Sequence, residues 1–350
     1  MDWSIKQILV TGGASFIGSH LVDRLVERGA RSIRVVDDLS SGEIENIQGH
    51  LARGSVQFFS YDLLAPGAAD AAVDGVDVVF HLAAIHGGRG YVELHQAECA
   101  QNLTLDGALI AAARRAGVEK FVFASSGCVY PNYVQQDPGQ QLYLTEEMAG
   151  PPYDADGMYG WAKLMAEMTL RACHRTYGMN AVSCRFFTVY GERGVENHAV
   201  MAMIARAFVG QDPFEVWGDG TQLRNWTYVG DIVDGMILCA QKVGDGCAVN
   251  LGTMERTSVL EAAREVLRYT GHDVEIRFLP DMPTGPLNRI ASNALGRRLL
   301  GWEPKMKFVD GLHRTIDWYV SNKDPAHVRS YLERMLTGRG QRALAGEPLR

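Results

Sequence analysis

"ILVTGGASFIGSHL", residues 8–21, joins a short apolar run to a glycine-rich turn and then to a helix-like pattern. Residues 8–10 predict a buried strand. After the turn, apolar side chains recur every fourth position at Ile17, Leu21 and Leu25, which is the spacing of one helix face. A strand, a glycine turn and a helix in this order predict the start of a βαβ unit whose turn can bind a nucleotide.

The same alternation continues through the first half of the chain. Short runs rich in Val, Ile and Phe separate stretches with helical spacing. Alternation of this kind predicts right-handed crossovers and a parallel sheet covered by helices on both faces. We therefore expect an α/β fold with a doubly wound Rossmann sheet. The expected strands are residues 8–10, 32–36, 56–61, 76–83, 120–126 and 181–186.

Beyond residue 186 the pattern loosens and Gly and Pro become frequent. We expect the Rossmann domain to cover residues 1–186, with a strand and helix near 226–252 returning to its sheet. A smaller α/β lobe for the substrate is expected at residues 187–330. Residues 333–350 have little to bury, and we expect them to form a loose tail.

Composition excludes several classes of function. The chain has 350 residues, of which 47% are hydrophobic, and a formal net charge of -7, so no footprint for nucleic acid or for an acidic membrane surface is indicated. No apolar run is long enough to span a bilayer, and no signal peptide is recognisable at the start. The six cysteines form no CxxC pair, which favours reduced thiols in a cytoplasm and no metal site.

The ends of the first three predicted strands point to a dinucleotide. Gly12 and Gly18 permit a tight turn and a close approach of the helix, although Ser15 stands where the motif has a further glycine. Asp37 ends the second strand, where a carboxylate accepts bonds from a ribose and repels a 2′-phosphate. We therefore expect NAD rather than NADP. The expected NAD-binding residues are Gly12, Ser15, Phe16, Ile17, Gly18, Asp37, Asp38, Ser40, Asp62, Leu63, Ala83, Ala84, Tyr159 and Lys163.

Tyr159 and Lys163 form a candidate catalytic pair, because they are four residues apart on one face of a predicted helix. A phenol is a poor base at neutral pH, but an adjacent ammonium stabilises the phenolate. Such a pair can take a hydroxyl proton while a hydride passes to nicotinamide.

Together with "SSGCVYP" (residues 125–131), these features resemble the extended short-chain dehydrogenase/reductase family, in particular its nucleotide-sugar members, over about residues 5–320. The resemblance implies that Ser126 binds the reacting sugar oxygen. At the positions of Gly127 and Cys128 the 4,6-dehydratases of the family carry an Asp-Glu acid pair, whereas its GDP-mannose 3,5-epimerases carry a cysteine. The resemblance thus implies an NAD-dependent epimerase of a nucleotide-activated hexose.

Two other segments, "GGRGYV" (87–92) and "FEVWGDGTQLRNWTYVGD" (214–231), are also similar to the 3,5-epimerases. Two positions differ: His198 stands in place of the second proton-transfer group, a lysine, and Thr188 in place of an asparagine. The resemblance implies that arginines bind the diphosphate. The implied substrate contacts are Gly87, Arg89, Ser126, Gly127, Cys128, Thr188, His198, Arg206, Gln222, Leu223, Arg224 and Arg289.

Oxidation of a sugar at C4 acidifies the C–H bonds at C3 and C5, and inversion there requires proton transfer on both faces of the ring. A thiol can serve as one of the two groups, so we expect Cys128 to act with a partner, for which His198 is the candidate. The alternative is that His198 is a surface histidine and that the second group lies elsewhere. The expected catalytic residues are Ser126, Cys128, Tyr159, Lys163 and His198. Alternatives are that Cys128 only packs, that the enzyme is a nucleotide-sugar 4-epimerase, or that the chain is a non-catalytic NAD-binding regulator. The resemblance also implies a homodimer, joined through helices near 97–116 and 158–177.

Overall fold

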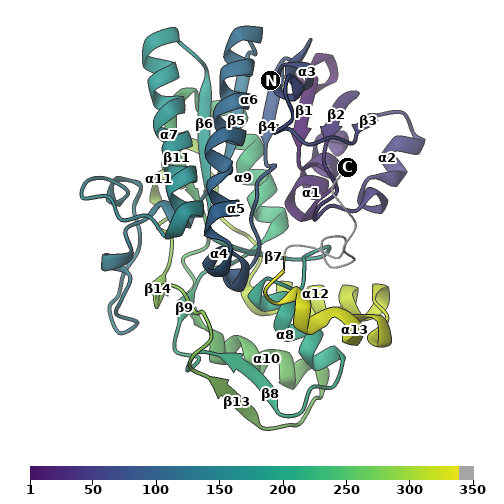
Figure 1. Cartoon of the computed structure of the whole chain (residues 1–350), viewed down its shortest axis with the longest axis vertical. Helices are drawn as coiled ribbons and strands as arrows, with labels where there is room; N and C mark the ends of the chain where they lie inside the picture. The colour runs from purple at the N-terminus through teal and green to yellow at the C-terminus, as the bar shows by residue number, and fades with distance from the viewer. Residues whose placement is uncertain (339–350) are drawn as a thin grey trace.

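A seven-stranded parallel sheet forms the centre of the larger part of the molecule (Figure 1). The computed structural model describes residues 1–338. The strand order β11-β6-β5-β4-β1-β2-β3 confirms the predicted doubly wound sheet, because the chain moves outward from β1 on one side and from β4 on the other. The strands are β1 (Gln7–Thr11), β2 (Ser32–Val36), β3 (Val56–Phe59), β4 (Val78–His81), β5 (Lys120–Ser126), β6 (Ala181–Phe186) and β11 (Asp245–Leu251).

Helices cover both faces of this sheet. Along β1, Ile8 and Val10 pack into a core with α1 and α9, whereas Leu9 packs into a second core with α3, α6 and α7. This alternation follows from the two-residue period of a strand, and it explains why the central strands read as continuous apolar runs. The helices of this part are α1 (Phe16–Glu27), α2 (Gln48–Ala52), α3 (Ala68–Val73), α4 (Arg89–Leu94), α5 (Gln96–Ala100), α6 (Asn102–Ala116), α7 (Gly157–Tyr177), α9 (Val229–Lys242) and α11 (Ala294–Leu300).

A smaller lobe lies below the carboxyl ends of the strands in Figure 1. Its strands form three small sheets: β8 (Phe214–Trp217) with β13 (Ile276–Leu279), β7 (Thr188–Tyr190) with β10 (Trp226–Tyr228), and β9 (Leu223–Arg224) between β12 (Thr257–Ser258) and β14 (Asn288–Arg289). Its helices are α8 (Ala199–Phe208), α10 (Val259–Thr270), α12 (Phe308–Asn322) and α13 (Pro325–Met335).

The chain crosses between the two parts more than once. After β6 it enters the lobe through α8 and β8, and it then returns through α9 to place β11 beside β6 in the main sheet. Residues 245–251 therefore supply an outer strand of a sheet whose other strands end at residue 186.

The end of the chain differs from the expected loose tail. Helix α13 runs to Met335, and both Met335 and Leu336 are buried in the core, because α13 presents an apolar face to the lobe. The packed structure therefore extends past residue 333. Residues 339–350 of the expected tail lie outside the described residues. Within the described part of the chain, the helices are too short or too polar to cross a membrane.

Candidate active site

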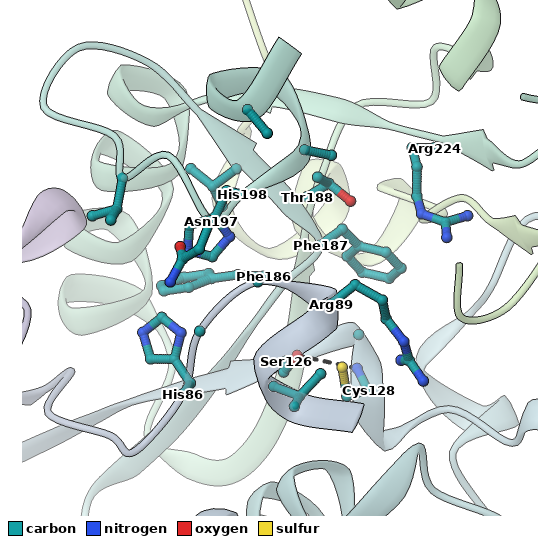
Figure 2. Close-up of a pocket in the computed structure, with 18 of the residues that line it drawn as sticks. His86, Arg89, Ser126, Cys128, Phe186, Phe187, Thr188, Asn197, His198 and Arg224 are labelled. Carbon is teal, nitrogen blue, oxygen red and sulfur yellow. Dashed lines mark hydrogen bonds between the residues drawn. The ribbon is translucent and has the colours of Figure 1, made fainter. Parts of the chain in front are cut away.

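A cavity of about 330 Å³ lies between the carboxyl ends of the main sheet and the lobe (Figure 2). Parallel sheets place their ligand sites at this edge. The predicted residues that line the cavity are Ser15, Phe16, Ile17, Gly18, Ala84, Gly87, Arg89, Ser126, Gly127, Cys128, Tyr159, Lys163, Thr188, His198, Arg206, Gln222, Arg224 and Arg289. Those outside its lining are Gly12, Asp37, Asp38, Ser40, Asp62, Leu63, Ala83 and Leu223.

The glycine turn has the shape that a pyrophosphate requires. A Cβ on Gly18 would lie 2.0 Å from the Gly12 carbonyl oxygen, so only glycine lets α1 begin this close to the turn. The Ser15 hydroxyl donates to the same carbonyl at 2.6 Å and does not cap the helix. The first N–H groups of α1 therefore face the cavity without a side-chain cap from residues 1–338, as a bound diphosphate needs.

The Asp37 carboxylate joins the end of β2 to this turn. It accepts hydrogen bonds from the backbone N–H of Ala14 at 3.0 Å and of Leu39 at 2.9 Å. Each carboxylate oxygen can accept more than one bond, so Asp37 can still receive the hydroxyls of a ribose. The geometry of this turn fits NAD.

The other predicted carboxylates at the strand tips close their own turns. Asp38 accepts bonds from the backbone N–H and the hydroxyl of Ser40, and Asp62 accepts one from the N–H of Leu64. Leu63 packs into the second core, and the Leu223 backbone bonds to residue 287. None of these residues lines the cavity.

The turn after β5 presents Cys128 to the cavity. The backbone N–H of Cys128 donates to the Ser126 hydroxyl at 3.1 Å, and the thiol sulfur accepts a bond from Arg289 Nη1 at 3.3 Å. Helix α7 packs tightly on this turn, because a Cβ on Gly160 would lie 2.3 Å from the Cys128 carbonyl oxygen. This packing brings Tyr159 next to Ser126.

The Tyr159–Lys163 pair is arranged differently from the expectation. The pKa of Tyr159 is raised, chiefly by burial, and the neighbouring Cys128 and Asp106 act in the same direction, whereas a hydrogen bond with Ser126 opposes them. The Lys163 ammonium lies 5.9 Å from the centre of the tyrosine ring and forms an ion pair with Asp106 at 3.5 Å. Lys163 is thus paired with the carboxylate of Asp106, a residue that sequence analysis missed.

Three arginines gather near Cys128. Strands β9 and β14 pair in the register that places Arg224 beside Arg289, and Arg289 shares the Asp156 carboxylate with Arg89, at 2.9 and 2.8 Å. Burial, together with these two neighbouring cations, lowers the pKa of Arg224 to about 9. The arrangement has more positive than negative charge, which favours binding of an anion such as a diphosphate.

Two further polar side chains of the lobe, Arg206 and Gln222, each have buried atoms with no hydrogen-bond partner within residues 1–338. Arg206 is only 4% exposed, yet its Nε and Nη2 make no hydrogen bond there, and neither does Oε1 of the buried Gln222. Both line the cavity beside Trp217. Buried polar atoms are normally satisfied, so these atoms indicate a polar ligand.

His198 is the N-cap residue directly before α8, and burial lowers the pKa of its imidazole to about 4, so it is neutral at physiological pH. In Figure 2 it lies on a different side of the cavity from Cys128. Sequence analysis missed His86, whose ring centre is 6.0 Å from that of Tyr159 and 5.9 Å from that of His198. Its position soon after the end of β4 was the available signal.

The model of the NAD-dependent epimerase/dehydratase family matches residues 8–252. The chain belongs to this family. It is 32% identical over 317 residues to GDP-mannose 3,5-epimerase 1 of Oryza sativa subsp. japonica, covering 89% of this chain and 81% of that protein. NAD is the cofactor of the family, and the glycine turn described above fits it.

Solved structures of other family members have the same architecture. The UDP-glucose 4-epimerase of Thermotoga maritima, determined with UDP-glucose, is 30% identical with a TM-score of 0.79, covering 90% of this chain and 99% of that one. The dTDP-glucose 4,6-dehydratase of Streptomyces venezuelae, determined with NAD bound, is 26% identical with a TM-score of 0.83, covering 94% and 99%. This family member is therefore an enzyme of nucleotide-sugar chemistry, and its relatives differ in the reaction they catalyse.

Proposed function

We propose that the enzyme is an epimerase that inverts C5, C3 or both in a nucleotide-activated hexose, in the manner of GDP-mannose 3,5-epimerases. The observation that carries the proposal is the position of Cys128. Its thiol faces the cavity between Ser126 and Arg289, beside Tyr159, where a 4-epimerase has no use for a proton donor. The similarity to the rice 3,5-epimerase supports the same choice.

In this mechanism each residue has one role. Ser126 binds the C4 oxygen, and Tyr159 takes the C4 hydroxyl proton and later returns it. Bound NAD supplies the hydride acceptor for C4 and then the hydride donor. The neutral imidazole of His198 can accept a proton from the acidified carbon, and Cys128 can deliver one to the opposite face. Arg89, Arg206, Arg224 and Arg289 hold the diphosphate.

Two other functions use the same fold. In a 4-epimerase, which the similarity to the Thermotoga maritima enzyme favours, Cys128 would only pack against Arg289. A non-catalytic NAD-binding regulator would need no hydride machinery, so the presence of Ser126, Tyr159 and Lys163 in one cavity argues against it.

Solvent isotope exchange tests the proposal. The enzyme is incubated in D₂O with a panel of GDP-, UDP-, dTDP- and CDP-hexoses, and the products are followed by NMR and mass spectrometry. We expect deuterium at C5, at C3 or at both, and none at C4, because the C4 hydrogen returns from the cofactor. Epimerisation at C4 without deuterium on carbon would establish the 4-epimerase instead, and no turnover of any sugar would favour the regulator.

Cys128→Ala identifies the proton donor. The variant should still bind NAD, but inversion should fall by about 10²- to 10⁴-fold, which is the usual contribution of a general acid or base. Cys173→Ala is the matched control, because it also removes a partly exposed thiol, which here lies on α7. This variant should leave inversion unchanged. Equal activity of the two variants would exclude a catalytic role for Cys128.

A further inference from the structure

A chain of buried polar groups connects the cofactor turn with the catalytic lysine. Its members are Thr11 at the end of β1, His81 at the end of β4, Asp106 on α6 and Lys163 on α7, and none is more than 1% exposed. Only Lys163 belongs to the site as the sequence predicts it. Four polar side chains in a protein interior cost free energy unless each one is satisfied by another.

The hydrogen bonds fix the charge state of this chain. The Thr11 hydroxyl oxygen accepts bonds from the backbone N–H groups of Leu82 and Ala83, both at 3.1 Å, so its own proton points to His81 Nδ1 at 2.7 Å. Nδ1 is then an acceptor, and the proton of the neutral ring is on Nε2, which donates to Asp106 Oδ1 at 3.1 Å. Burial lowers the pKa of His81, in agreement with a neutral ring. Asp106 is therefore the anionic member.

The second oxygen of Asp106 faces Lys163. Oδ2 lies 3.5 Å from Nζ, and neither atom makes a hydrogen bond within residues 1–338. The other groups around the ammonium are the ring of Phe123 on β5, 4.5 Å away, and the ring of Tyr159 on its own helix. His81 faces the ammonium from β4, Cys99 and Cys128 act on Tyr159, and the buried Glu167 is bound to Arg185.

We propose that Asp106 is the positioning residue of Lys163, which it keeps protonated and directed toward the cofactor side of the cavity. A lysine buried this deeply loses its proton readily, because burial disfavours the ammonium. Asp106 is the carboxylate that pairs with it in the described chain. The hydrogen bonds from Thr11 to His81 and from His81 to Asp106 hold the Asp106 carboxylate in place. They connect it to Thr11, the residue just before the glycine turn. The inference rests on one part of the proposed function, namely that Lys163 promotes the ionisation of Tyr159.

Asp106 affects the ionisation of Tyr159 in two opposite ways, directly and through Lys163. The negative charge of Asp106 by itself raises the pKa of Tyr159 and so opposes its ionisation. If Lys163 stayed protonated without Asp106, removal of that carboxylate would lower the pKa of Tyr159 and favour its phenolate form. If Lys163 needs Asp106 to stay protonated, removal deprives Tyr159 of the ammonium and raises the pKa of Tyr159. The two cases move the pH dependence in opposite directions.

Direct titration of Lys163 tests the inference without any sugar. The protein is labelled with ¹³C-lysine, and the Lys163 signal is assigned by its loss in Lys163→Arg. In Asp106→Asn the midpoint of the Lys163 titration should fall, whereas in Asp74→Asn, which neutralises an exposed carboxylate, it should remain unchanged. An unchanged or raised midpoint in Asp106→Asn would overturn the proposal. If Asp106→Asn fails to fold, Asp106→Thr serves with the same expectation.

Once a turned-over substrate is known, the pH–rate profile gives a second readout. The rising limb of Asp106→Asn should move to higher pH, and the rate at neutral pH should drop about tenfold or more. In a Lys163→Arg background, where the cation cannot lose its proton, the same substitution should move the limb to lower pH or leave it in place. A shift to lower pH with Lys163 intact would show that Asp106 only opposes Tyr159. The lysine titration stands even if the enzyme proves to be a 4-epimerase.

Discussion

Gly18 controls the cofactor turn at the scale of a single residue. Any side chain there meets the Gly12 carbonyl, a backbone atom that cannot rotate away. Gly18→Ala should therefore push α1 from the turn and weaken NAD binding by at least about tenfold, or 1.4 kcal/mol. Isothermal titration measures this loss. Gly49→Ala, whose Cβ would meet open space in α2, is the control and should bind NAD normally. Equal affinities would mean that the turn adapts.

Asp37 separates the two nicotinamide cofactors. Its carboxylate repels a 2′-phosphate, so the unaltered enzyme should bind NAD more tightly than NADP. Asp37→Ser should weaken NAD binding and narrow the gap, since it removes both the ribose acceptor and the bonds to Ala14 and Leu39. Fluorescence titration with the two reduced cofactors measures the ratio. If Asp37→Ser kept the full preference for NAD over NADP, residues other than Asp37 would distinguish the two cofactors.

Helix α7 acts as one element with the Cys128 turn, because Gly160 lets the two backbones touch. Gly160→Ala should displace the turn and misplace Ser126, Cys128 and Tyr159 together. A displacement of about 1 Å can cost about 10²-fold in rate. We expect that loss in turnover with NAD affinity retained, measured by steady-state kinetics beside cofactor titration. Unimpaired turnover would show that the turn can slide along α7.

Elements whose signals are local could be predicted from the sequence. The predicted ends of the strands up to residue 186 lie within two residues of the observed ends, because buried parallel strands are short apolar runs. The glycine turn could be predicted because the residues that form it lie in one stretch of sequence. The partners of the site residues could not be predicted. Asp106 stands in an ordinary helical pattern, and Asp156 meets Arg289 133 positions away along the chain. The direction of the Lys163 side chain depends on how α7 packs against α6 and β5, and a short sequence motif contains no information on that packing.

At the scale of the whole molecule, stability should fall on mild acidification. Burial lowers the pKa of both His20 and His198 to about 4, from an ordinary value near 6.5. Between these values the unfolded chain binds protons that the folded protein does not, so the free energy of unfolding decreases as the pH falls through this window. Thermal denaturation from pH 7.5 to pH 4.5 measures the effect. His20→Gln should show a smaller drop in Tm, and an identical drop would exclude His20 as a source.

Homodimerisation is the second prediction at this scale. Leu103 on α6 and Met165 on α7 are 43% and 45% exposed, and the helices that carry them lie side by side on one face of the sheet (Figure 1). Light scattering should give the mass of a dimer at micromolar concentration. Leu103→Asp with Met165→Asp should yield a folded monomer, because a charge cannot be buried unpaired in an apolar contact. A monomer before substitution would rule out this interface.

The position of β11 beside β6 also has a consequence for biosynthesis. While the chain is being translated, β6 leaves the ribosome well before residues 245–251 exist, so the nascent sheet has an open edge. Every side chain of β6 is buried in the finished enzyme, and an exposed strand edge with unpaired backbone N–H and C=O groups recruits other chains. The lobe is synthesised during that interval, and the sheet can close only after it. A polypeptide released at residue 186 should therefore aggregate or remain bound to chaperones, however complete its glycine turn.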